Sequence, residues 1–299
     1  MYKRLAVSIV AAMAVGMSFP LLRAQSAAPQ VDKWNSIPPA RSTYAGKKPG
    51  PAPRRDMTGI WDTSWGGVAG APEYPATYVG YNRTDGGALD ESSVTKPLPY
   101  TPAGRAALIA NKPSGPGVRQ VDSALSNDPA NLCDPLGFPY MFMWESRVIN
   151  MVQSPTQVVM INPFYGGYRI IWTDGRALPK DPDPRWNGYS VGRWVDDVTF
   201  AVQTNGLTSK SWLDHAGRPH SEQAVIDETY RRVDMDTMEL TMKITDPVMY
   251  TQPWVMLNKG VFHNLPADFD IRENLCSPSE NQGYNDDYAN TAIRPGSKP

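Results

Sequence analysis

An excess of charge of either sign is the first thing that this 299-residue chain lacks. Its 29 lysines and arginines nearly balance its 30 aspartates and glutamates, which leaves a formal net charge of −1. The one basic cluster, AGKKPGPAPRR, lies inside a proline-rich segment. Nucleic acids and anionic membrane surfaces attract strongly basic proteins, so the sequence predicts neither of them as a partner.

Long apolar runs are equally scarce, since only the run from Leu5 to Leu22 approaches the length of a membrane span. Two basic residues precede this run, and small residues follow it from Ala24 onward. A membrane anchor is one interpretation, but Pro20 and the small residues favour a secretory signal peptide. We therefore expect residues 1–24 to be removed and the mature protein to be periplasmic or secreted, without stable insertion in the membrane.

Cysteine is nearly absent, and only Cys133 and Cys276 remain in the exported product. An oxidising compartment permits a disulfide, and one bridge requires one pair. Joining positions so far apart would stabilise the fold by about 5 kcal/mol if the bridge acts through loop entropy. Two buried thiols are the alternative. Neither cysteine belongs to a C-x-x-C motif, so we expect a structural disulfide and no redox catalysis.

Helical patterns are rare, whereas 29 prolines, 24 glycines, 9 tryptophans and 14 tyrosines are typical of a β-rich domain with long ordered loops. Residues 25–56 combine proline, lysine and small residues, which predicts a flexible tether. The remaining residues, 57–299, are expected to form a single domain. One short helix is expected within TPAGRAALIAN, where Thr101 supplies the N-cap and Pro102 the first helical position.

Strand patterns dominate from residue 144 onward. The segment MELTMKIT alternates apolar and polar residues, which is the period of a half-buried antiparallel strand. Short strands with no helices between them predict an all-β fold, in which an antiparallel sheet closes into a barrel or sandwich to hide its edges. The other expected strands are SRVINMVQ, TQVVMIN, YRIIWTDGR, DVTFAVQTNG, QAVIDETYRRVD, YTQPWVMLNKG and IRENLC.

Three motifs in this region resemble a large group of exported bacterial proteins, most of them uncharacterised. They are G-x-S-V-G-x-W at residues 188–194, P-H-S at 219–221 and D-P-x-x-Y-x-x-P-W at 246–254. The segment TGIW, with Gly59 and Trp61, is similar to the G-x-W that opens lipocalin-like barrels, where the tryptophan plugs one end. The resemblance implies a lipocalin-like antiparallel β-barrel and carries no defined activity.

The segment WLDHAGRPHSEQ, residues 212–223, contains two of the three histidines of the chain. A histidine titrates near neutral pH, and a neighbouring carboxylate can orient it and raise its basicity. We expect His220 to act as a general base or acid that Asp214 orients. In the group that the chain resembles, the P-H-S histidine is typical, whereas the position of His215 often holds another residue.

Two further titratable residues follow in the segment QAVIDETYRR, where Glu228 and Tyr230 share one face of the expected strand. If that face lines a barrel, both side chains project into the interior that His220 borders. A carboxylate among apolar rings can serve as an acid or a base. We expect Glu228 and Tyr230 to form the opposing acid, while Arg231 or Arg232 holds a substrate carboxylate or phenolate.

Each of these residues also has a structural interpretation. Asp214 can cap a turn, His220 can bond a backbone carbonyl, and Glu228 can pair with an arginine. A metal site is another alternative, but Gly217 and Pro219 lie between His215 and His220, so the two do not share a helical face, and their spacing on a loop is unspecific. We therefore expect no metal ligands.

The segment GYSVG matches the G-x-S-x-G nucleophile elbow of hydrolases, with Ser190 at its centre. The elbow needs a strand before the serine and a helix after it, whereas a strand pattern follows here. We expect Ser190 to be a turn residue. A hydrolase that uses Ser190 or a metal stays an alternative.

These residues predict an exported, cofactor-independent lyase or isomerase that acts on a small hydrophobic, aromatic molecule by proton transfer, elimination or decarboxylation with ring opening. No phosphate loop, dinucleotide fingerprint or haem motif indicates a cofactor. Trp194, Trp212 and His215 are expected to bind substrate beside Arg231, because tryptophan rings are platforms for aromatic ligands. A periplasmic carrier of an apolar ligand is the alternative, since it needs the same lining without a titratable pair. The sequence leaves the oligomeric state open.

Overall fold

The computed structural model describes residues 34, 36, 49–62, 98–113, 126–143, 148–163, 167–214 and 217–284. The predicted signal peptide lies outside the described residues, and so does most of the predicted tether. The last residues of that tether are bonded to the domain, because the Arg55 amide donates to the Asp197 carbonyl at 2.7 Å and the Met235 amide donates to the Gly50 carbonyl at 3.0 Å. The division of the chain into signal peptide, tether and domain stays a prediction.

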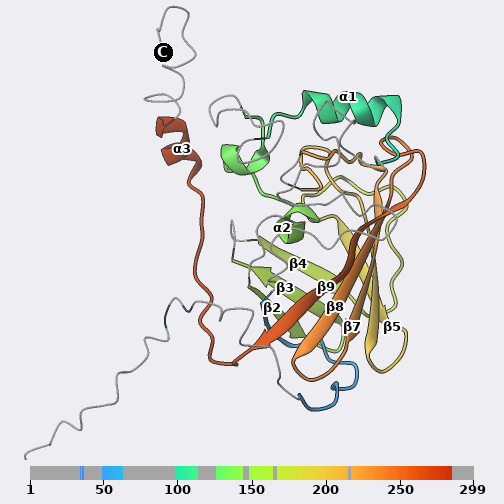
Figure 1. Cartoon of the computed structure of the whole chain (residues 1–299), viewed down its shortest axis with the longest axis vertical. Helices are drawn as coiled ribbons and strands as arrows, with labels where there is room; N and C mark the ends of the chain where they lie inside the picture. Colours follow the sequence, from blue (N-terminus) through green and yellow to red (C-terminus); the bar gives the residue numbers. More distant parts are fainter. Residues whose placement is uncertain are drawn as a thin grey trace, which may run out of the picture. The chain divides into compact units, whose positions relative to one another are not determined.

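Nine strands form one closed barrel, in which neighbours in sequence are neighbours in the sheet and β9 pairs with β1 (Figure 1). The all-β prediction is therefore confirmed, and the helices are few and short. The strands are β1 (Gly59–Asp62), β2 (Ile149–Gln153), β3 (Gln157–Asn162), β4 (Gly167–Trp172), β5 (Tyr189–Trp194), β6 (Thr199–Asn205), β7 (Val225–Arg232), β8 (Thr237–Thr245) and β9 (Trp254–Leu265). The described helices are α1 (Pro102–Ala110), the 3-10 helix η4 (Pro129–Leu132), α2 (Tyr140–Met143) and α3 (Pro278–Tyr284). None of these described helices has the length and apolar character to cross a bilayer.

One pair of strands departs from the expected antiparallel pattern. Strands β4 and β5 run parallel, with Ile171 beside Ser190 and Trp172 beside Val191, whereas the other eight pairs are antiparallel. A parallel pair needs a connection that returns along the barrel. Residues 173–188 provide it. The prediction of a wholly antiparallel barrel is wrong at this pair, because the sequence of a strand does not encode the direction of its neighbour.

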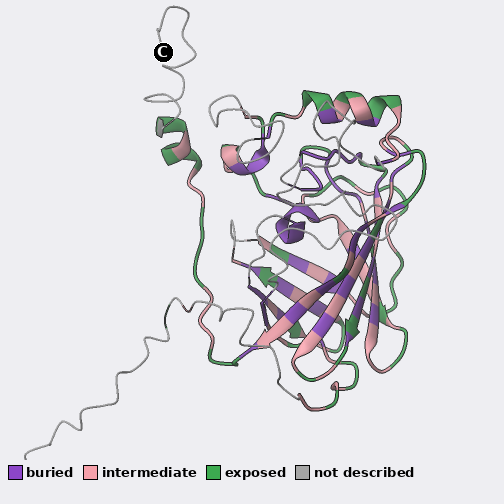
Figure 2. Cartoon of the chain, in the orientation of Figure 1, coloured by how far each residue is buried: buried purple, intermediate pink, exposed green. Residues whose placement is uncertain are grey.

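Alternation along the strands builds the barrel interior. In β8 the four apolar residues of MELTMKIT are fully buried, while the residues between them are half-buried or exposed, as the sequence predicts. Buried and partly exposed residues alternate in the same way along β3, β6 and β7 (Figure 2). Each large apolar side chain removed from water in this way contributes about 1.5–3 kcal/mol, so the interior is the main source of stability.

The two ends of the barrel differ, and we call them the turn end and the loop end. The turn end carries the short β2–β3, β5–β6 and β7–β8 connections. There Trp61 is fully buried, and its indole Nε1 donates to the carbonyl of Met57 at 3.2 Å. The guanidinium of Arg232 lies 4.6 Å from the Trp61 ring and donates to the carbonyls of Asp56 and Met235. The Trp61 ring and the Arg232 side chain thus pack together at the turn end.

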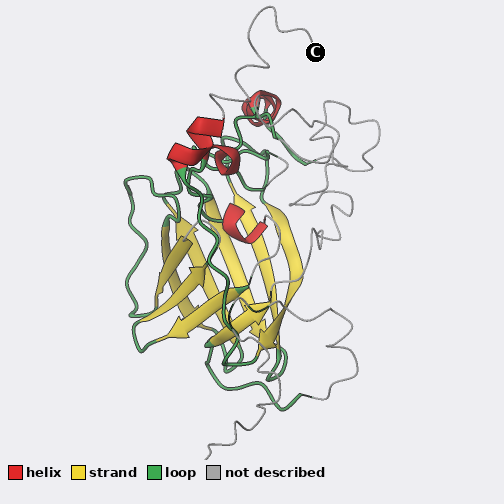
Figure 3. Ribbon diagram, turned by 90° about the vertical axis from the view of Figure 1, so that its left-hand side faces the viewer, coloured by secondary structure: helices red, strands yellow, loops and turns green. Residues whose placement is uncertain are grey.

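Helices lie at the loop end, above the strands (Figure 3). The predicted α1 is confirmed, with the Thr101 side chain accepting from the Gly104 amide at 2.9 Å. A Cβ on Gly104 would lie 2.0 Å from the carbonyl oxygen of Met249, so only glycine lets α1 rest on the β8–β9 connection. The side-chain amide of Asn162 in β3 joins helix α2 to the barrel, because its Nδ2 donates to the carbonyl of Met141 at 3.0 Å.

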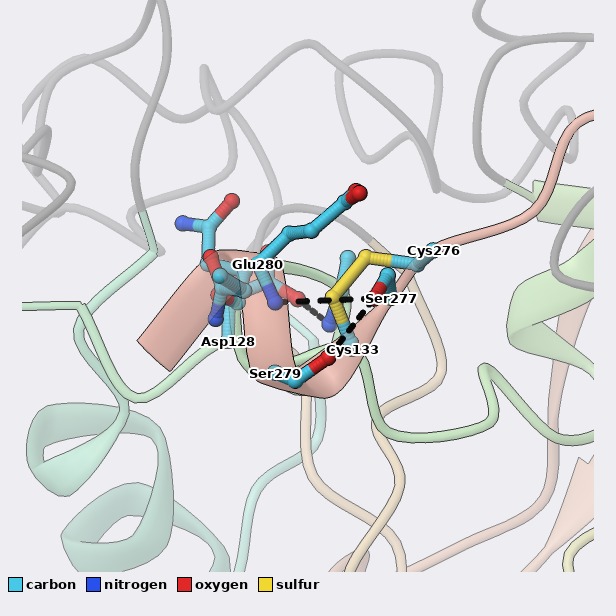
Figure 4. Close-up of a disulfide and its surroundings, with 9 residues drawn as sticks. Asp128, Cys133, Cys276, Ser277, Ser279 and Glu280 are labelled. Atoms are coloured by element: carbon cyan, nitrogen blue, oxygen red, sulfur yellow. Dashed lines mark hydrogen bonds between the residues drawn. A yellow bond between two sulfur atoms is a disulfide. The ribbon is translucent and has the colours of Figure 1, made fainter. Parts of the chain in front are cut away.

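The predicted disulfide is confirmed. Cys133 follows η4 and is bonded to Cys276, just before α3 (Figure 4). The side chain of Asn281 in α3 also donates to the carbonyl of Asn131 in η4 at 2.9 Å. The segment IRENLC, expected to be a strand, is instead part of the connection from β9 to this bridge. That prediction is wrong, since the closed barrel leaves no free edge for a tenth strand.

Candidate functional site

Five polar side chains meet inside the barrel, and we call them the interior polar cluster. They occupy inward positions on four strands, β4 to β7, and each is at most 2% exposed. Burying polar and charged groups is costly unless each one is paired. Each of these side chains therefore needs hydrogen-bond partners inside the barrel. The cluster consists of Arg169, Ser190, Thr204, Glu228 and Tyr230.

A bidentate ion pair between Arg169 and Glu228 forms the centre of this cluster. The Nη1 and Nη2 atoms of Arg169 donate to the two carboxylate oxygens of Glu228 at 2.8 and 2.5 Å. Nη2 also donates to Thr204 Oγ1 at 2.6 Å, and Nε donates to Ser190 Oγ at 3.0 Å. A guanidinium has five N–H groups. Four are thus used by Glu228, Thr204 and Ser190, and the guanidinium also interacts with the Tyr230 hydroxyl.

Tyr230 completes the cluster by donating its hydroxyl to Glu228 Oε2 at 2.7 Å. Burial, and then the negative charge of Glu228, raise the pKa of Tyr230 well above its ordinary value of 10.0. The phenol therefore stays protonated at neutral pH. Burial alone would lower the pKa of Arg169, but the charge and hydrogen bonds of Glu228 outweigh it and raise that pKa. The cluster holds a fixed cation, a carboxylate and a protonated phenol.

Apolar groups surround these polar atoms. The ring of Phe138, from the segment before α2, lies 3.7 Å from the guanidinium carbon of Arg169. The rings of Tyr230 and Phe262 are 6.3 Å apart. Electrostatic interactions are stronger in such surroundings than in water. A negative charge that formed on a neighbouring ligand would therefore be strongly stabilised by the cation of Arg169.

A cleft of about 650 Å³ borders the cluster at the β4–β5 pair, and we call it the β4–β5 cleft. Arg169 and Ser190 belong to its lining, so two members of the interior polar cluster reach its wall, with Thr204, Glu228 and Tyr230 behind them. Aromatic and arginine side chains of β4, β5 and their connection form much of the rest. The aromatic lining residues are Tyr168, Trp172, Trp186 and Tyr189.

The cleft exists because the parallel seam is short. Only two residue pairs join β4 to β5, so the start of β4 extends beyond this ladder. There the side-chain amide of Asn187 donates to the carbonyl of Tyr168 at 2.7 Å, in place of a hydrogen bond between strands. The connection then turns into β5 at Gly188, where φ is +58° and a Cβ would lie 2.5 Å from the Asn205 carbonyl oxygen. Glycine is therefore required at this turn.

The predicted base, His220, lies at the loop end on the connection between β6 and β7. It is 2% exposed; its Nδ1 lies 3.3 Å from the carbonyl oxygen of Ser221, and its Nε2 is buried with no hydrogen-bond partner among the described residues. Burial lowers the pKa of His220 below its ordinary 6.5, which leaves the ring neutral at pH 7. Asp214 pairs with Arg218, and within the described structure no hydrogen bond joins it to His220.

The residues around His220 fasten two connections together. The amide and hydroxyl of Ser221 donate to the carboxylate of Asp246 at 2.6 and 2.7 Å, and Asp246 also accepts two backbone amides of its own turn. The Tyr250 hydroxyl donates to the carbonyl of Pro219 at 2.9 Å. The P-H-S and D-P-x-x-Y motifs are therefore in contact. We call this group the loop cluster, made of Asp214, Arg218, His220, Ser221, Asp246 and Tyr250.

Two other predicted site residues lie in unexpected places. Arg231 projects outward from β7 and is 3.7 Å from Glu239, so it does not face the interior polar cluster. Ser190 is the second residue of β5, which makes the prediction of a turn residue wrong. The glycines on either side of it suggested a turn, but its hydroxyl lies inside the barrel, 2.9 Å from Thr204 Oγ1. Its hydrogen bonds to Arg169 and Thr204 do not include the base that a serine nucleophile needs.

The predicted tryptophans lie at opposite ends of the barrel. Trp212 is buried at the loop end, with its ring stacked 6.4 Å from that of Tyr140. Trp194 ends β5 and packs 5.1 Å from Phe200. Neither belongs to the lining of the β4–β5 cleft, and His215 lies outside the described residues. Within the described ranges, no three histidine, cysteine or acidic side chains are grouped to hold a metal.

The interpretation of the sequence missed the central residue, Arg169. A signal is present, because the segment YRIIW places this arginine in the same phase as the buried Ile171. An arginine at an inward position of an apolar strand needs a buried carboxylate, and Glu228 is an inward carboxylate on another strand. Comparisons of the chain with protein-family models, with curated proteins and with solved structures find no match, so the geometry alone supports the site.

Proposed function

We propose that the protein is an exported enzyme that transfers a proton to or from a small aromatic substrate without a cofactor, as a lyase or isomerase. The observation that supports this is the interior polar cluster, in which Arg169, a cation that lines the β4–β5 cleft, holds the Glu228 carboxylate, and Glu228 accepts the hydroxyl of the protonated phenol of Tyr230. A lipocalin-like barrel with one ligand site is part of the proposal.

Each group has a distinct role in this proposal. Tyr230 is the proton donor, because its raised pKa keeps the phenol protonated. Arg169 stabilises negative charge on the substrate through the positive charge of its guanidinium, and Glu228 fixes both Arg169 and Tyr230. In a decarboxylation, the bond to the carboxylate breaks, carbon dioxide leaves, and the electron pair left on carbon takes the Tyr230 proton. Solvent then returns a proton to the phenolate. A positioned acid of this kind contributes about 10²–10⁴-fold in rate.

A carrier is the second candidate, and the saturation of the cluster favours it. Glu228, Tyr230 and Arg169 satisfy one another, as in a network that only stabilises the fold. In that case the aromatic cleft alone would bind the ligand. A carrier needs no proton donor, so substitution of Tyr230 separates the two candidates.

The test compares wild-type mature protein with Tyr230→Phe on a panel of hydroxylated aromatic acids and neutral aromatics, with products followed by chromatography. The enzyme predicts at least about a 100-fold fall in kcat, since the general acid is lost. Tyr250→Phe is the matched control, because it removes a buried hydroxyl of the loop cluster and should leave kcat unchanged. Binding of panel members without any turnover by the wild type would establish the carrier.

A second variant tests where the chemistry takes place. His220→Gln should retain turnover, because His220 belongs to the loop cluster and has no hydrogen bond to Glu228 or Tyr230 in the described structure. Loss of turnover with an unchanged Tm would return the role of base to His220. Thermal unfolding of each variant, followed by circular dichroism, separates loss of chemistry from loss of fold.

A further inference from the structure

We propose that the β4–β5 cleft binds a hydroxylated aromatic carboxylate, with Arg185 as the residue that contacts the carboxylate. This names the substrate class of the proposed enzyme and rests on that proposal for the chemistry. Binding itself is measured independently of turnover.

The first argument for this ligand is the positive charge of the cleft lining. Its described lining contains three arginines and no acidic side chain, in a chain whose net charge is only −1. Two of the three already have carboxylate partners, since Arg169 pairs with Glu228 and Arg176 lies 2.6 Å from Asp174. Arg185 has no carboxylate partner in the described part of the chain. It is therefore the cation that a ligand anion meets.

The backbone fixes the position of Arg185. Its amide donates to the Gly206 carbonyl at 2.9 Å, and its carbonyl accepts the Thr208 amide at 3.0 Å. Its guanidinium lies 4.2 Å from the centre of the Tyr189 ring. A planar guanidinium matches a carboxylate with two parallel hydrogen bonds, and a fixed position reduces the entropy lost on binding.

The second argument for this ligand is the aromatic lining of the cleft. Trp172, Trp186 and Tyr189 are each only partly buried, so ring faces remain for a ligand. The Trp172 ring already holds the guanidinium of Arg176 at 3.6 Å, which shows that a flat group fits against it. The volume of about 650 Å³ lies in the range of small-molecule sites. An aromatic ring is therefore the apolar part that this cleft matches.

The third argument for this ligand is the side-chain amide oxygen of Asn187, which has no hydrogen-bond partner in the described structure. Asn187 lines the cleft, and its Nδ2 is held by the Tyr168 carbonyl. The other end of the amide, Oδ1, is buried with no hydrogen-bond partner in the described structure. A buried acceptor of this kind is stabilised when a donor reaches it, and the cleft has room for a ligand hydroxyl. The ligand thus carries a hydroxyl as well as a carboxylate.

The experiment is calorimetric titration of the mature protein with 4-hydroxybenzoate, benzoate, 4-hydroxybenzamide and cyclohexanecarboxylate. We expect 4-hydroxybenzoate to bind most tightly, and Arg185→Gln to weaken its binding by at least about tenfold, since a charge-assisted bidentate contact is lost. Arg185→Lys should give an intermediate loss. Arg193→Gln is the matched control, because Arg193 is an exposed arginine of β5 that does not line the cleft, and binding should stay within about twofold.

Three results would overturn the proposal. They are an absence of saturable heat with every probe, equal binding of the acid and its amide, or full affinity in Arg185→Gln. Benzoate binding as tightly as 4-hydroxybenzoate would remove the hydroxyl from the assignment. Binding that depends on Arg185 without turnover means that this inference stands and the proposed enzyme fails. Turnover of a neutral aromatic by a protein that binds no carboxylate means the reverse.

Discussion

The described part of the chain contains two buried ion pairs, and they differ in what surrounds them. Arg169 and Glu228 come from different strands and meet across the interior, and Arg169 lines a cleft. Asp214 and Arg218 are four residues apart in one connection, and their neighbours join that connection to the next. Each of the two pairs joins an arginine to a carboxylate, and both are buried. The difference lies in whether the pair adjoins a space that a ligand can fill.

This difference matters because a buried ion pair is weak evidence for stability. Replacing such a pair with apolar residues of similar size is often neutral or stabilising, whereas removing one partner is strongly destabilising. Stability alone therefore does not explain the pair that joins β4 to β7, and a role in ligand binding would explain it. The loop cluster has a structural reason instead, since it satisfies the backbone groups of two long connections.

The largest expected effect comes from breaking either pair. Arg169→Met and Arg218→Met should each lower the free energy of unfolding by about 3–5 kcal/mol, because a buried carboxylate loses its partner. Urea titration measures this. The double variants Arg169→Met/Glu228→Leu and Asp214→Leu/Arg218→Met should recover most of the loss. Only the first double variant should lose ligand binding and turnover, and retention of both activities would make the interior polar cluster structural.

The next effect concerns Asp246, the acceptor that joins the two motifs. Asp246→Ala should cost about 2–3 kcal/mol in unfolding free energy, because the buried Ser221 donors lose their partner. Asp227→Ala is the matched control, since Asp227 is 38% exposed and pairs with Lys243 on the outer wall. It should cost less than about 0.5 kcal/mol. Equal losses in the two variants would contradict the structural role of the loop cluster.

A smaller effect is expected from pH, through His220. Its pKa lies below 6.5 in the folded protein because of burial, whereas the unfolded chain has the ordinary value. The unfolded state therefore takes up the proton first, and stability should fall as the pH drops below about 6.5. The slope is at most about 1.4 kcal/mol per pH unit, until the folded pKa is reached. Urea midpoints from pH 7.5 to 5 should show a flatter profile for His220→Gln, and identical profiles would contradict the burial of a neutral ring.

The smallest effect is expected on the outer wall. Arg231→Ala should change the free energy of unfolding by less than about 0.5 kcal/mol, because Arg231 is 55% exposed and its contact with Glu239 is long. Ligand affinity, measured by calorimetry, should be unchanged. A marked loss of affinity would show that the ligand site extends to the outer face of β7.

Much of the fold could be predicted from the sequence, because it depends on local patterns. The alternation in β8, the cap at Thr101 and the pairing of Cys133 with Cys276 follow from residue type and spacing. The parallel β4–β5 pair could not be predicted, since strand direction is set by tertiary packing. The glycine-rich GYSVG also has the composition of a turn, yet it forms most of β5.

The site was predicted only in part, for a similar reason. Glu228 and Tyr230 share the inward face that the alternation gives them, and both are buried. Their partner Arg169 lies 59 residues before Glu228, and no local pattern joins the two. Proximity along the chain instead suggested Asp214 as the partner of His220, but Arg218 is the residue that pairs with Asp214. Contacts between distant strands decide such partnerships.

The disulfide has a consequence for protein that has been cut by proteases. Cys133 precedes β2 and Cys276 follows β9, so the bridge encloses eight of the nine strands in one covalent ring. A single cleavage in the β4–β5 connection would therefore leave both fragments linked. Such a nicked molecule would migrate as one band on a non-reducing gel and as two after reduction. A protein with this ring can lose a peptide bond and still keep its halves at high effective concentration.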